Sequence, residues 1–265
     1  MILFEVILLA IIQGITEFLP ISSSAHLLLP NIILGWQEQG LAFDVAVHLG
    51  SLAAVLIYFR DDILEMTKAW FGHIAGQGAT EHSRLAWWLI GATIPAVLAG
   101  FFGKAYIEEY ARSGVVIAST TIVFGLLLWL SSSVAKEQYE LPQMGLKRAM
   151  IIGLFQVLAL IPGTSRSGIT ITAGLFLGLS RESAAKFSFL LSIPVILGAS
   201  LLLLLDLLQQ TATVDWLMLS IGTALSFVSA YLCITVFLSF IKQIGFLPFV
   251  IYRLILGIVL FSLVI

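Results

Sequence analysis

The segment Pro162-Gly-Thr-Ser-Arg-Ser-Gly168 interrupts an apolar stretch that runs from residue 149 to residue 179. A similar interruption, Glu17-Phe-Leu-Pro-Ile-Ser-Ser-Ser24, divides the apolar stretch 2–35. Each arm beside an interruption has about ten to fifteen residues, whereas a helix needs about 20 residues to span a bilayer. Proline disfavours helix in the residue before it, and unpaired backbone at membrane depth needs protein or a wet cavity around it. We therefore predict two re-entrant helical hairpins, each entering and leaving on one side of the membrane.

The rest of the chain is also apolar enough to lie in a membrane. Of its 265 residues, 60% are hydrophobic and 11% are charged, whereas a soluble domain has about 25% charged residues. Six segments have the length and composition of transmembrane helices, and they run near 43–59, 85–103, 114–131, 187–206, 215–239 and 248–265. The predicted fold is an all-α polytopic membrane protein with six transmembrane helices and two re-entrant hairpins, forming one membrane domain over residues 1–265.

Two halves of the chain, about 1–131 and 147–265, show the same order of one hairpin followed by three spans. Gln13-Gly-Ile-Thr-Glu-Phe-Leu-Pro-Ile-Ser-Ser in the first half is similar to Gln156-Val-Leu-Ala-Leu-Ile-Pro-Gly-Thr-Ser in the second after a one-residue gap. Three spans per half would invert the second half, and inverted repeats with broken helices place their site where the breaks meet. We predict such an inverted-topology repeat; the alternative is chance similarity between apolar helices.

The distribution of lysine and arginine predicts the orientation in the membrane. One side of the predicted topology carries only Lys104 and Arg112. The other side carries nine basic residues, which are Arg60, Lys68, Arg84, Lys136, Lys147, Arg148, Arg181, Lys186 and Lys242. The second side is therefore predicted to face the cytoplasm, with both termini and the 207–214 loop outside.

Each interruption contains a formally charged residue that stands alone in the apolar sequence around it. Glu17 is the only such residue between Val6 and Gln37, and Arg166 is the only one in 149–180. An ionisable group inside a membrane costs about 2.5–3.5 kcal/mol on insertion scales, so both residues are functional candidates. The alternative is an ion pair that only locks the hairpins together, but such a lock would not require the polar residues around it.

The residues around these two charges suit a phosphate group. Serines precede the second helix of each predicted hairpin and could cap it, and helix N-termini present free N–H groups to anions. These serines are Ser22, Ser23, Ser24, Ser165 and Ser167. Gly163 and Gly168 let the backbone approach a ligand closely, and the guanidinium of Arg166 matches phosphate oxygens. Two helix starts and an arginine inside a membrane predict an anion site.

His26 lies three residues after Ser23 and four after Ser22, so the three share a face if the helix begins near Ser22. A serine needs a base to act as a nucleophile at neutral pH, and histidine or glutamate can serve. The alternative for His26 is an ordinary core histidine with its hydrogen bonds satisfied.

Other polar residues have weaker signals. His73 and His82 fall in the polar stretch near 60–84 and are expected to be solvated. The i,i+4 pair Asp44 and His48 is expected to make a hydrogen bond at the outer end of a span, with lining of the site as the alternative. Tyr252 and Arg253 in the last span are candidates for bordering the site.

The motifs Gln13-x-x-x-Glu17, Pro20-Ile-Ser-Ser23, His26 and Pro162-Gly-Thr-Ser-Arg-Ser-Gly-Ile-Thr170 resemble those of the bacterial undecaprenyl pyrophosphate phosphatases, also called the bacitracin-resistance family. The resemblance covers essentially the whole chain. It implies hydrolysis of undecaprenyl pyrophosphate to undecaprenyl phosphate and inorganic phosphate, which recycles the lipid carrier for peptidoglycan synthesis and confers bacitracin resistance. It also implies the bacterial cytoplasmic (inner) membrane, a site open to the periplasm, and a divalent cation, either Mg²⁺ or Ca²⁺.

The candidate site residues form three groups, and the resemblance carries over by position all of them except Gly163, Thr164 and Gly168. The catalytic group is Glu17, Ser22, Ser23, His26 and Arg166. The phosphate-binding group is Gly163, Thr164, Ser165, Ser167, Gly168 and Thr170. The cation would be held by Glu17 and Gln13. Many family members have glutamate where Gln13 stands, and since an amide is no base, a mechanism that needs two carboxylates does not fit here.

The sequence leaves several mechanisms and functions open. Ser22 or Ser23 would attack the terminal phosphorus, or orient a water that does, and His26 or Glu17 would take the proton. Type 2 phosphatidate phosphatases use a histidine after Ser-Arg, and the absence of any histidine after Arg166 argues against that mechanism and against an intramembrane serine protease. The alternative function is a lipid flippase or secondary transporter of the same architecture.

The expected partners are a polyprenyl pyrophosphate lipid and the bilayer. The net charge of −2 argues against nucleic-acid binding, and the single cysteine, Cys233, excludes an intramolecular disulfide. A homodimer is left open.

Overall fold

The computed structural model describes residues 2–37, 40–208 and 215–264. Within these ranges, six helices are long and apolar enough to cross a membrane, so the predicted all-α polytopic fold is confirmed. They are α3 (Leu41–Tyr58), α5 (Glu81–Tyr110), α6 (Gly114–Val134), α9 (Arg181–Leu208), α10 (Trp216–Ile244) and α11 (Leu247–Val264). Most of the predicted 207–214 loop lies outside the described residues.

Each predicted hairpin is a pair of short helices around an irregular tip. The first pair is α1 (Leu3–Phe18) and α2 (Ser23–Leu34). The second is α7 (Gly145–Gln156), extended by the 3₁₀ turn η2 (Val157–Leu160), and α8 (Arg166–Phe176). The chain breaks where the sequence predicts it, but re-entry from one side and the inverted relation of the two halves stay predictions.

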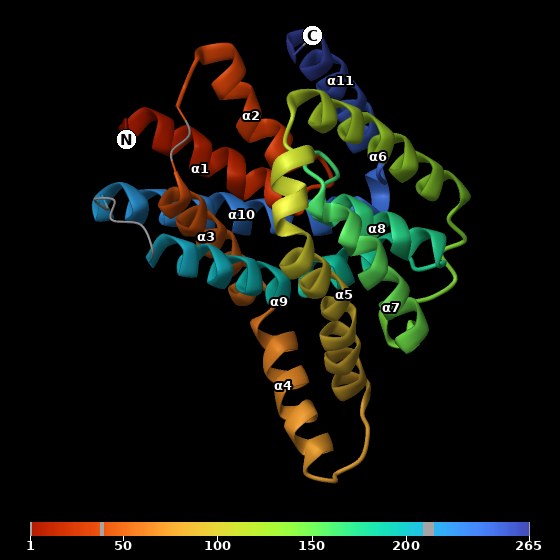
Figure 1. The fold of residues 1–265 in the computed structure, drawn as a ribbon. Coiled ribbons are helices and arrows are strands. Elements are labelled where there is room, and N and C mark those ends of the chain that lie inside the picture. Colours follow the sequence, from red (N-terminus) through yellow and green to blue (C-terminus); the bar gives the residue numbers. More distant parts are fainter. Residues whose placement is uncertain (1, 38–39, 209–214, 265) are drawn as a thin grey trace.

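One helix, α4 (Arg60–Ile74), was not anticipated from the sequence, where this stretch reads as a polar loop. Two acidic residues, Asp61 and Asp62, stand in its first turn, where they suit the positive end of the helix dipole. The ring of Trp70 packs against that of Trp87 in α5 at a centroid distance of 5.5 Å. Figure 1 shows α4 and the first turns of α5 projecting together from the helical body.

The body is assembled by close contacts between helices, in which small residues take the crossing points. Helix α10 packs against both α1 and α3, and α6 packs against α11. A Cβ added at Gly14 of α1 or at Gly50 of α3 would collide with the backbone of α10. Ser51 and Ser226 join α3 to α10 through a hydroxyl contact of 3.0 Å. Small residues at crossings are typical of helix packing in membranes.

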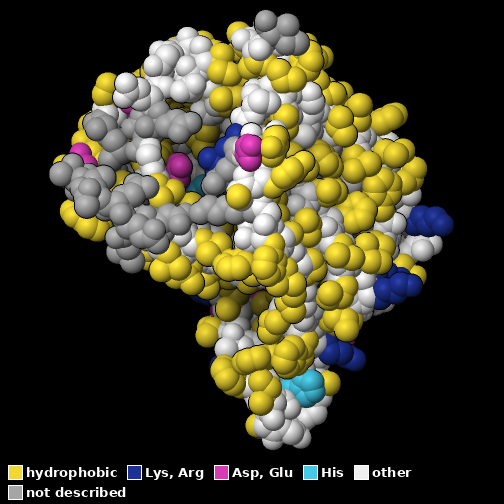
Figure 2. Space-filling view, in the orientation of Figure 1, with side chains coloured by type: hydrophobic (Ala, Val, Ile, Leu, Met, Phe, Trp, Pro, Cys, Tyr) yellow, Lys and Arg dark blue, Asp and Glu magenta, His cyan; other side chains and the backbone are white. Residues whose placement is uncertain are grey.

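The outer surface of the body is apolar, as contact with lipid requires. Figure 2 shows hydrophobic side chains over most of the visible face, with basic side chains at its lower right edge. Large side chains such as Phe102, Leu126 and Ile258 are exposed. The chain is therefore a multi-pass membrane protein.

Candidate active site

The second helix of each pair begins with a serine cap of the same kind. Ser22 caps α2 by accepting a hydrogen bond from the Ala25 N–H at 3.4 Å, and Ser165 caps α8 by accepting one from the Gly168 N–H at 3.1 Å. Both serines have positive φ values, 74° and 69°. Such backbone is unfavourable for residues other than glycine and persists only where the surroundings hold it. Here the caps are part of what holds it.

The two tips are hydrogen-bonded to each other. The N–H of Gly163 donates to Ser24 Oγ at 3.0 Å, and the Ser167 hydroxyl donates to the carbonyl of Leu19 at 2.8 Å. The N-termini of α2 and α8 are therefore fixed side by side. The first N–H groups of a helix have no partner within the helix, so both ends present donors to the same region.

Arg253 of α11 fixes the tips from behind. Its guanidinium donates to the carbonyl oxygens of Gly163 at 2.9 Å, Thr164 at 2.9 Å, Pro20 at 3.3 Å and Thr121 at 3.1 Å. The side chain is fully buried. One arginine thus joins both tips to α6, a much closer involvement than the bordering position that the sequence suggested.

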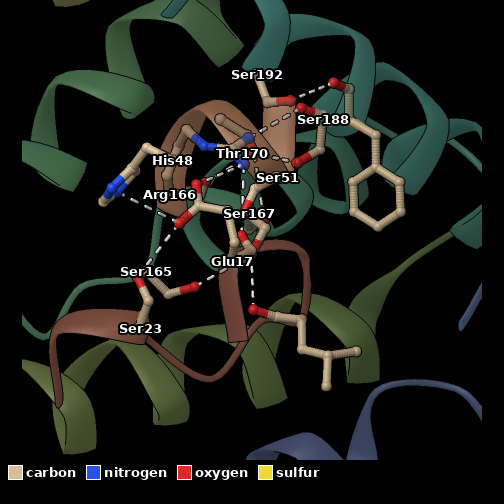
Figure 3. A network of polar contacts seen from close by, with 12 residues as sticks. Glu17, Ser23, His48, Ser51, Ser165, Arg166, Ser167, Thr170, Ser188 and Ser192 are labelled. Carbon is tan, nitrogen blue, oxygen red and sulfur yellow. Dashed lines mark hydrogen bonds and ion pairs between the residues drawn. The ribbon is translucent and has the colours of Figure 1, made fainter. Parts of the chain in front are cut away.

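Glu17 and Arg166 meet between the tips, as Figure 3 shows. Arg166 Nη2 lies 3.3 Å from Glu17 Oε1, and Arg166 Nη1 donates to the carbonyl of Ser188 in α9 at 3.2 Å. Arg166 Nε is buried without a hydrogen-bond partner among the described residues. The ion pair between Glu17 and Arg166 therefore exists, and the Nε–H of the guanidinium remains available to donate to a ligand.

Ser23 stands on the other side of the same carboxylate. Its hydroxyl donates to Glu17 Oε2 at 3.4 Å. Gln13, one turn earlier in α1, donates to the same oxygen at 2.9 Å. His48 of α3 places its Nε2 3.2 Å from the Gln13 Nε2 and 4.0 Å from Glu17 Oε2. Glu17 is therefore the centre of the cluster.

A cavity of about 300 Å³ opens onto this cluster. Its polar lining includes Glu17, Ser22, Ser23, Ser24, His48, Gly163, Ser165 and Arg166. Its opposite wall is apolar and consists of Ala159, Leu160, Ile161, Val195, Ile196 and Ala199. The space thus has one anion-binding end and one hydrocarbon-like wall.

Other predicted phosphate-binding residues lie just behind the cavity and hold its frame. The Thr170 hydroxyl is 2.7 Å from that of Ser188, and Ser167 is held by the first tip. Thr164 is buried with its carbonyl on Arg253. A Cβ on Gly168 would lie 3.0 Å from an Arg253 nitrogen. The space beside Gly168 is therefore taken by Arg253.

His26 is turned away from Ser23. Its Nδ1 lies 2.7 Å from the carbonyl of Ser22, and its Nε2 lies 2.6 Å from the hydroxyl of Tyr252 in α11. Its ring stacks on that of Tyr252. Both nitrogens are engaged, and His26 is outside the cavity lining. Of the two candidate nucleophiles, Ser23 is the one whose hydroxyl contacts a carboxylate, that of Glu17 at 3.4 Å.

A profile of the family described as bacitracin resistance protein BacA matches residues 6–259 of this chain. The chain belongs to the BacA family. It is 65% identical over 260 residues to an undecaprenyl-diphosphatase of Alteromonas mediterranea, with 98% of each chain covered. It is 60% identical over 259 residues to an undecaprenyl-diphosphatase of Teredinibacter turnerae, again with 98% of each covered. The resemblance read from the motifs is confirmed.

Three residues of this BacA-family site were missed or given too small a role by the sequence analysis. His48 reaches the cavity from α3 and is far from Glu17 in the sequence, so spacing alone could not bring the two together. Ser188 sits in an apolar span, and its contact with Arg166 is made through its backbone carbonyl. For Arg253 a signal existed, because a charged residue inside an apolar span is itself a functional indication.

Proposed function

We propose that this chain hydrolyses undecaprenyl pyrophosphate to undecaprenyl phosphate and inorganic phosphate, recycling the lipid carrier used for cell-wall synthesis. Family membership and the names of the two relatives support this function. The observation that carries it is the placement of Arg166 at the N-terminus of α8, beside Glu17 and the N-terminus of α2, with an N–H that has no partner among the described residues. Arginine and helix N-termini together bind phosphate and stabilise charge that builds on it in the transition state.

Ser23 and Glu17 are the pair that we assign to the chemical step. The Ser23 oxygen, or a water that it orients, forms a bond to the terminal phosphorus while the bridging P–O bond breaks. The carboxylate of Glu17, whose Oε2 lies 3.4 Å from the serine oxygen, takes the proton. Undecaprenyl phosphate leaves, and with serine as nucleophile water then releases the phosphate from a phosphoserine. Ser22 keeps its place as the cap of α2.

Glu17 and Gln13 would hold the divalent cation. Carboxylate and amide oxygens are suitable ligands for such ions, and Gln13 Oε1 is buried without a hydrogen-bond partner among the described residues. The donor set therefore fits. When bound, the cation would neutralise charge on the pyrophosphate oxygens. Gln13 itself supplies no base, so Glu17 is the one carboxylate available for proton transfer in this cluster.

The prenyl tail would leave along the apolar wall of the cavity, between η2 and α9. A larger groove of about 660 Å³ lies between α1, α10 and α11. It is lined by Ile11 and Ile15 of α1, and Ile15 is two positions from Glu17, so helix α1 separates this groove from the carboxylate. We therefore place the tail on the wall that contains Val195 and Ala199.

We also propose that the protein lies in the cytoplasmic (inner) membrane of a bacterium with its site open to the periplasm, as the resemblance implies. The asymmetry of basic residues supports an orientation with both termini outside. A homodimer belongs to the same set of proposals. Single cysteines in a Cys233→Ser background test the orientation. A cysteine at Lys68 should react only after the cytoplasmic face is opened, and external labelling there would overturn it.

The decisive experiment measures phosphate release from a prenyl pyrophosphate by purified protein in detergent. Detergent micelles hold no ion gradient, so an enzyme turns over and a transporter or flippase does not. Release that is lost in Arg166→Ala is the expected result. No release by the wild-type protein with any divalent cation would overturn the proposed function.

A further inference from the structure

Three groups that can each supply an electron pair surround one point beside the cavity. Glu17 Oε2 lies 2.9 Å from the amide nitrogen of Gln13 and 4.0 Å from His48 Nε2. The Gln13 amide nitrogen is 3.2 Å from His48 Nε2. In Figure 3 the ring of His48 faces Glu17 from α3. A carboxylate, an amide and an imidazole therefore converge from two helices.

The hydrogen bond of the other ring nitrogen fixes the tautomer of His48. Nδ1 lies 2.7 Å from the backbone carbonyl of Asp44, one turn earlier in α3. A carbonyl oxygen can only accept, so Nδ1 carries the hydrogen of the neutral ring and Nε2 presents its lone pair toward Glu17 and Gln13. Metal-binding histidines are typically held in this way, with the second nitrogen donating to a backbone carbonyl or carboxylate.

The amide of Gln13 is the second sign of a positive ligand. Its NH₂ group faces two acceptors, Glu17 and His48, while its Oε1 is buried without a partner among the described residues. A buried polar atom without a hydrogen bond is costly. A cation between Glu17 and His48 would replace the amide hydrogens as their positive partner, and the amide could then turn its oxygen to the same point.

We propose that His48 binds the divalent cation together with Glu17 and Gln13, and that this site prefers a transition-metal ion such as Mn²⁺ to Ca²⁺. The separation of 4.0 Å between Glu17 Oε2 and His48 Nε2 fits one shared ion, because two bonds of about 2.1 Å span at most about 4.2 Å. Imidazole is a good ligand for transition metals, whereas Ca²⁺ takes oxygen ligands.

No third His, Cys, Asp or Glu joins this cluster in the part of the chain that the structure describes. The remaining positions are left for water and for pyrophosphate oxygens. The inference rests on the proposed function for the presence of a cation and deepens it by naming a nitrogen ligand and the class of metal.

The test uses the purified full-length protein in detergent with Mn²⁺ alone. Pulsed electron paramagnetic resonance should detect the ¹⁴N modulation of a coordinated imidazole in the wild-type protein. His48→Gln should lose this signal and bind Mn²⁺ at least on the order of tenfold more weakly, since even second-shell changes cost that much. Ca²⁺ binding, measured by calorimetry, should change far less, because glutamine offers an oxygen in place of the imidazole.

His82→Gln is the matched control, because this histidine is exposed and pairs with Glu65 away from the cavity. It should bind Mn²⁺ like the wild-type protein and keep the nitrogen signal. A wild-type protein that releases phosphate from a prenyl pyrophosphate but shows no nitrogen coupling would overturn the His48 ligand and leave the proposed function standing. Nitrogen-coordinated Mn²⁺ without any phosphate release would support the ligand and overturn the function. Unchanged Mn²⁺ affinity in a folded His48→Gln protein would also overturn the ligand.

Discussion

Replacing Arg253 by lysine tests whether the hydrogen bonds that connect the two tips depend on the shape of the guanidinium as well as on its charge. Arg253 donates four hydrogen bonds from three nitrogens. Cβ atoms added at Gly125 and Gly168 would lie 3.2 and 3.0 Å from Arg253 atoms, so both positions leave room for the side chain. Lysine keeps the positive charge, but all its donors are on one nitrogen.

The size of the effect follows from the geometry. The carbonyls of Gly163 and Thr164 are neighbours in the chain, and one ammonium group can reach both. The carbonyls of Pro20 and Thr121 would then lose their donor. A hydrogen bond to a charged group contributes about 1.5–3 kcal/mol, so two lost bonds destabilise by at least about 3 kcal/mol. Arginine and lysine both bring a buried charge, so the desolvation cost largely cancels. At about 2–4 °C per kcal/mol, this minimum of about 3 kcal/mol lowers Tm by about 6–12 °C.

The assay is thermal unfolding of the purified protein in detergent, with phosphate release measured well below Tm. Arg253→Lys should unfold at a lower temperature and release phosphate more slowly, because the two tips are no longer held in a fixed relative position. Arg166→Lys is the comparison for stability: Arg166 pairs with Glu17 and the Ser188 carbonyl but does not join the two tips to α6, so Tm should fall less than in Arg253→Lys. An Arg253→Lys protein with the wild-type Tm would refute the reasoning, because the two lost bonds would then contribute no net stability.

The remaining predictions concern the cavity residues and the carboxyl group of Glu140. Arg166→Lys should lower phosphate release by orders of magnitude while the protein still inserts; near-normal turnover would show that the guanidinium fork is not needed. Ser23→Ala should be nearly inactive, whereas Ser22→Ala should stay active and lose about 1 kcal/mol of stability with its cap; substantial turnover in both would favour direct attack by water. Glu140 accepts hydrogen bonds from Ser183 and Ser180, which hold the pKa of its carboxyl below the ordinary value. The resulting stabilisation is present above the unfolded pKa of about 4.3 and is lost as pH falls through the lower folded value. Tm should therefore decline more steeply below that pH in the wild-type protein than in Glu140→Gln, and parallel declines would contradict this.

The transmembrane helices could be predicted because hydropathy alone decides whether a segment of about 20 residues enters a bilayer. The predicted span 114–131 corresponds to the helix Gly114–Val134, and 248–265 to Leu247–Val264. Helix α4 was missed for the converse reason, since its residues are too polar for a hydropathy argument. Its stability comes from packing on α5, which is a tertiary contact that local composition does not encode.

The charged residues of the site could be predicted because placing a charged side chain inside a membrane costs free energy. Glu17 and Arg166 stood out because each is an isolated charge in an apolar stretch, and the structure brings them to 3.3 Å. The partners of His26 were not predictable from spacing, because helical periodicity places it near Ser22 and Ser23 but cannot show Tyr252 from the last helix. His48 was underrated for the same reason, since its role depends on how α3 packs beside α1.

The two tips have the same backbone geometry and different chemistry, and this difference explains how one small cavity can both hold and cleave a phosphate. In each tip a capping serine has positive φ, and its hydroxyl lies 3.1 or 3.2 Å from that of the serine two positions on. The residue between those two serines is Ser23 in one tip and Arg166 in the other. Equivalent positions therefore carry the proposed nucleophile, Ser23, and the proposed phosphate-binding residue, Arg166.

The positions of Ser23 and Arg166 are held at a fixed separation, because Ser24 and Ser167 each bind the opposite tip. Glu17 contacts both Ser23 and Arg166. Arginine at both positions would bind phosphate but supply no nucleophile, and serine at both would supply a nucleophile but no guanidinium to bind phosphate. The chemistry therefore depends on the difference between the two tips.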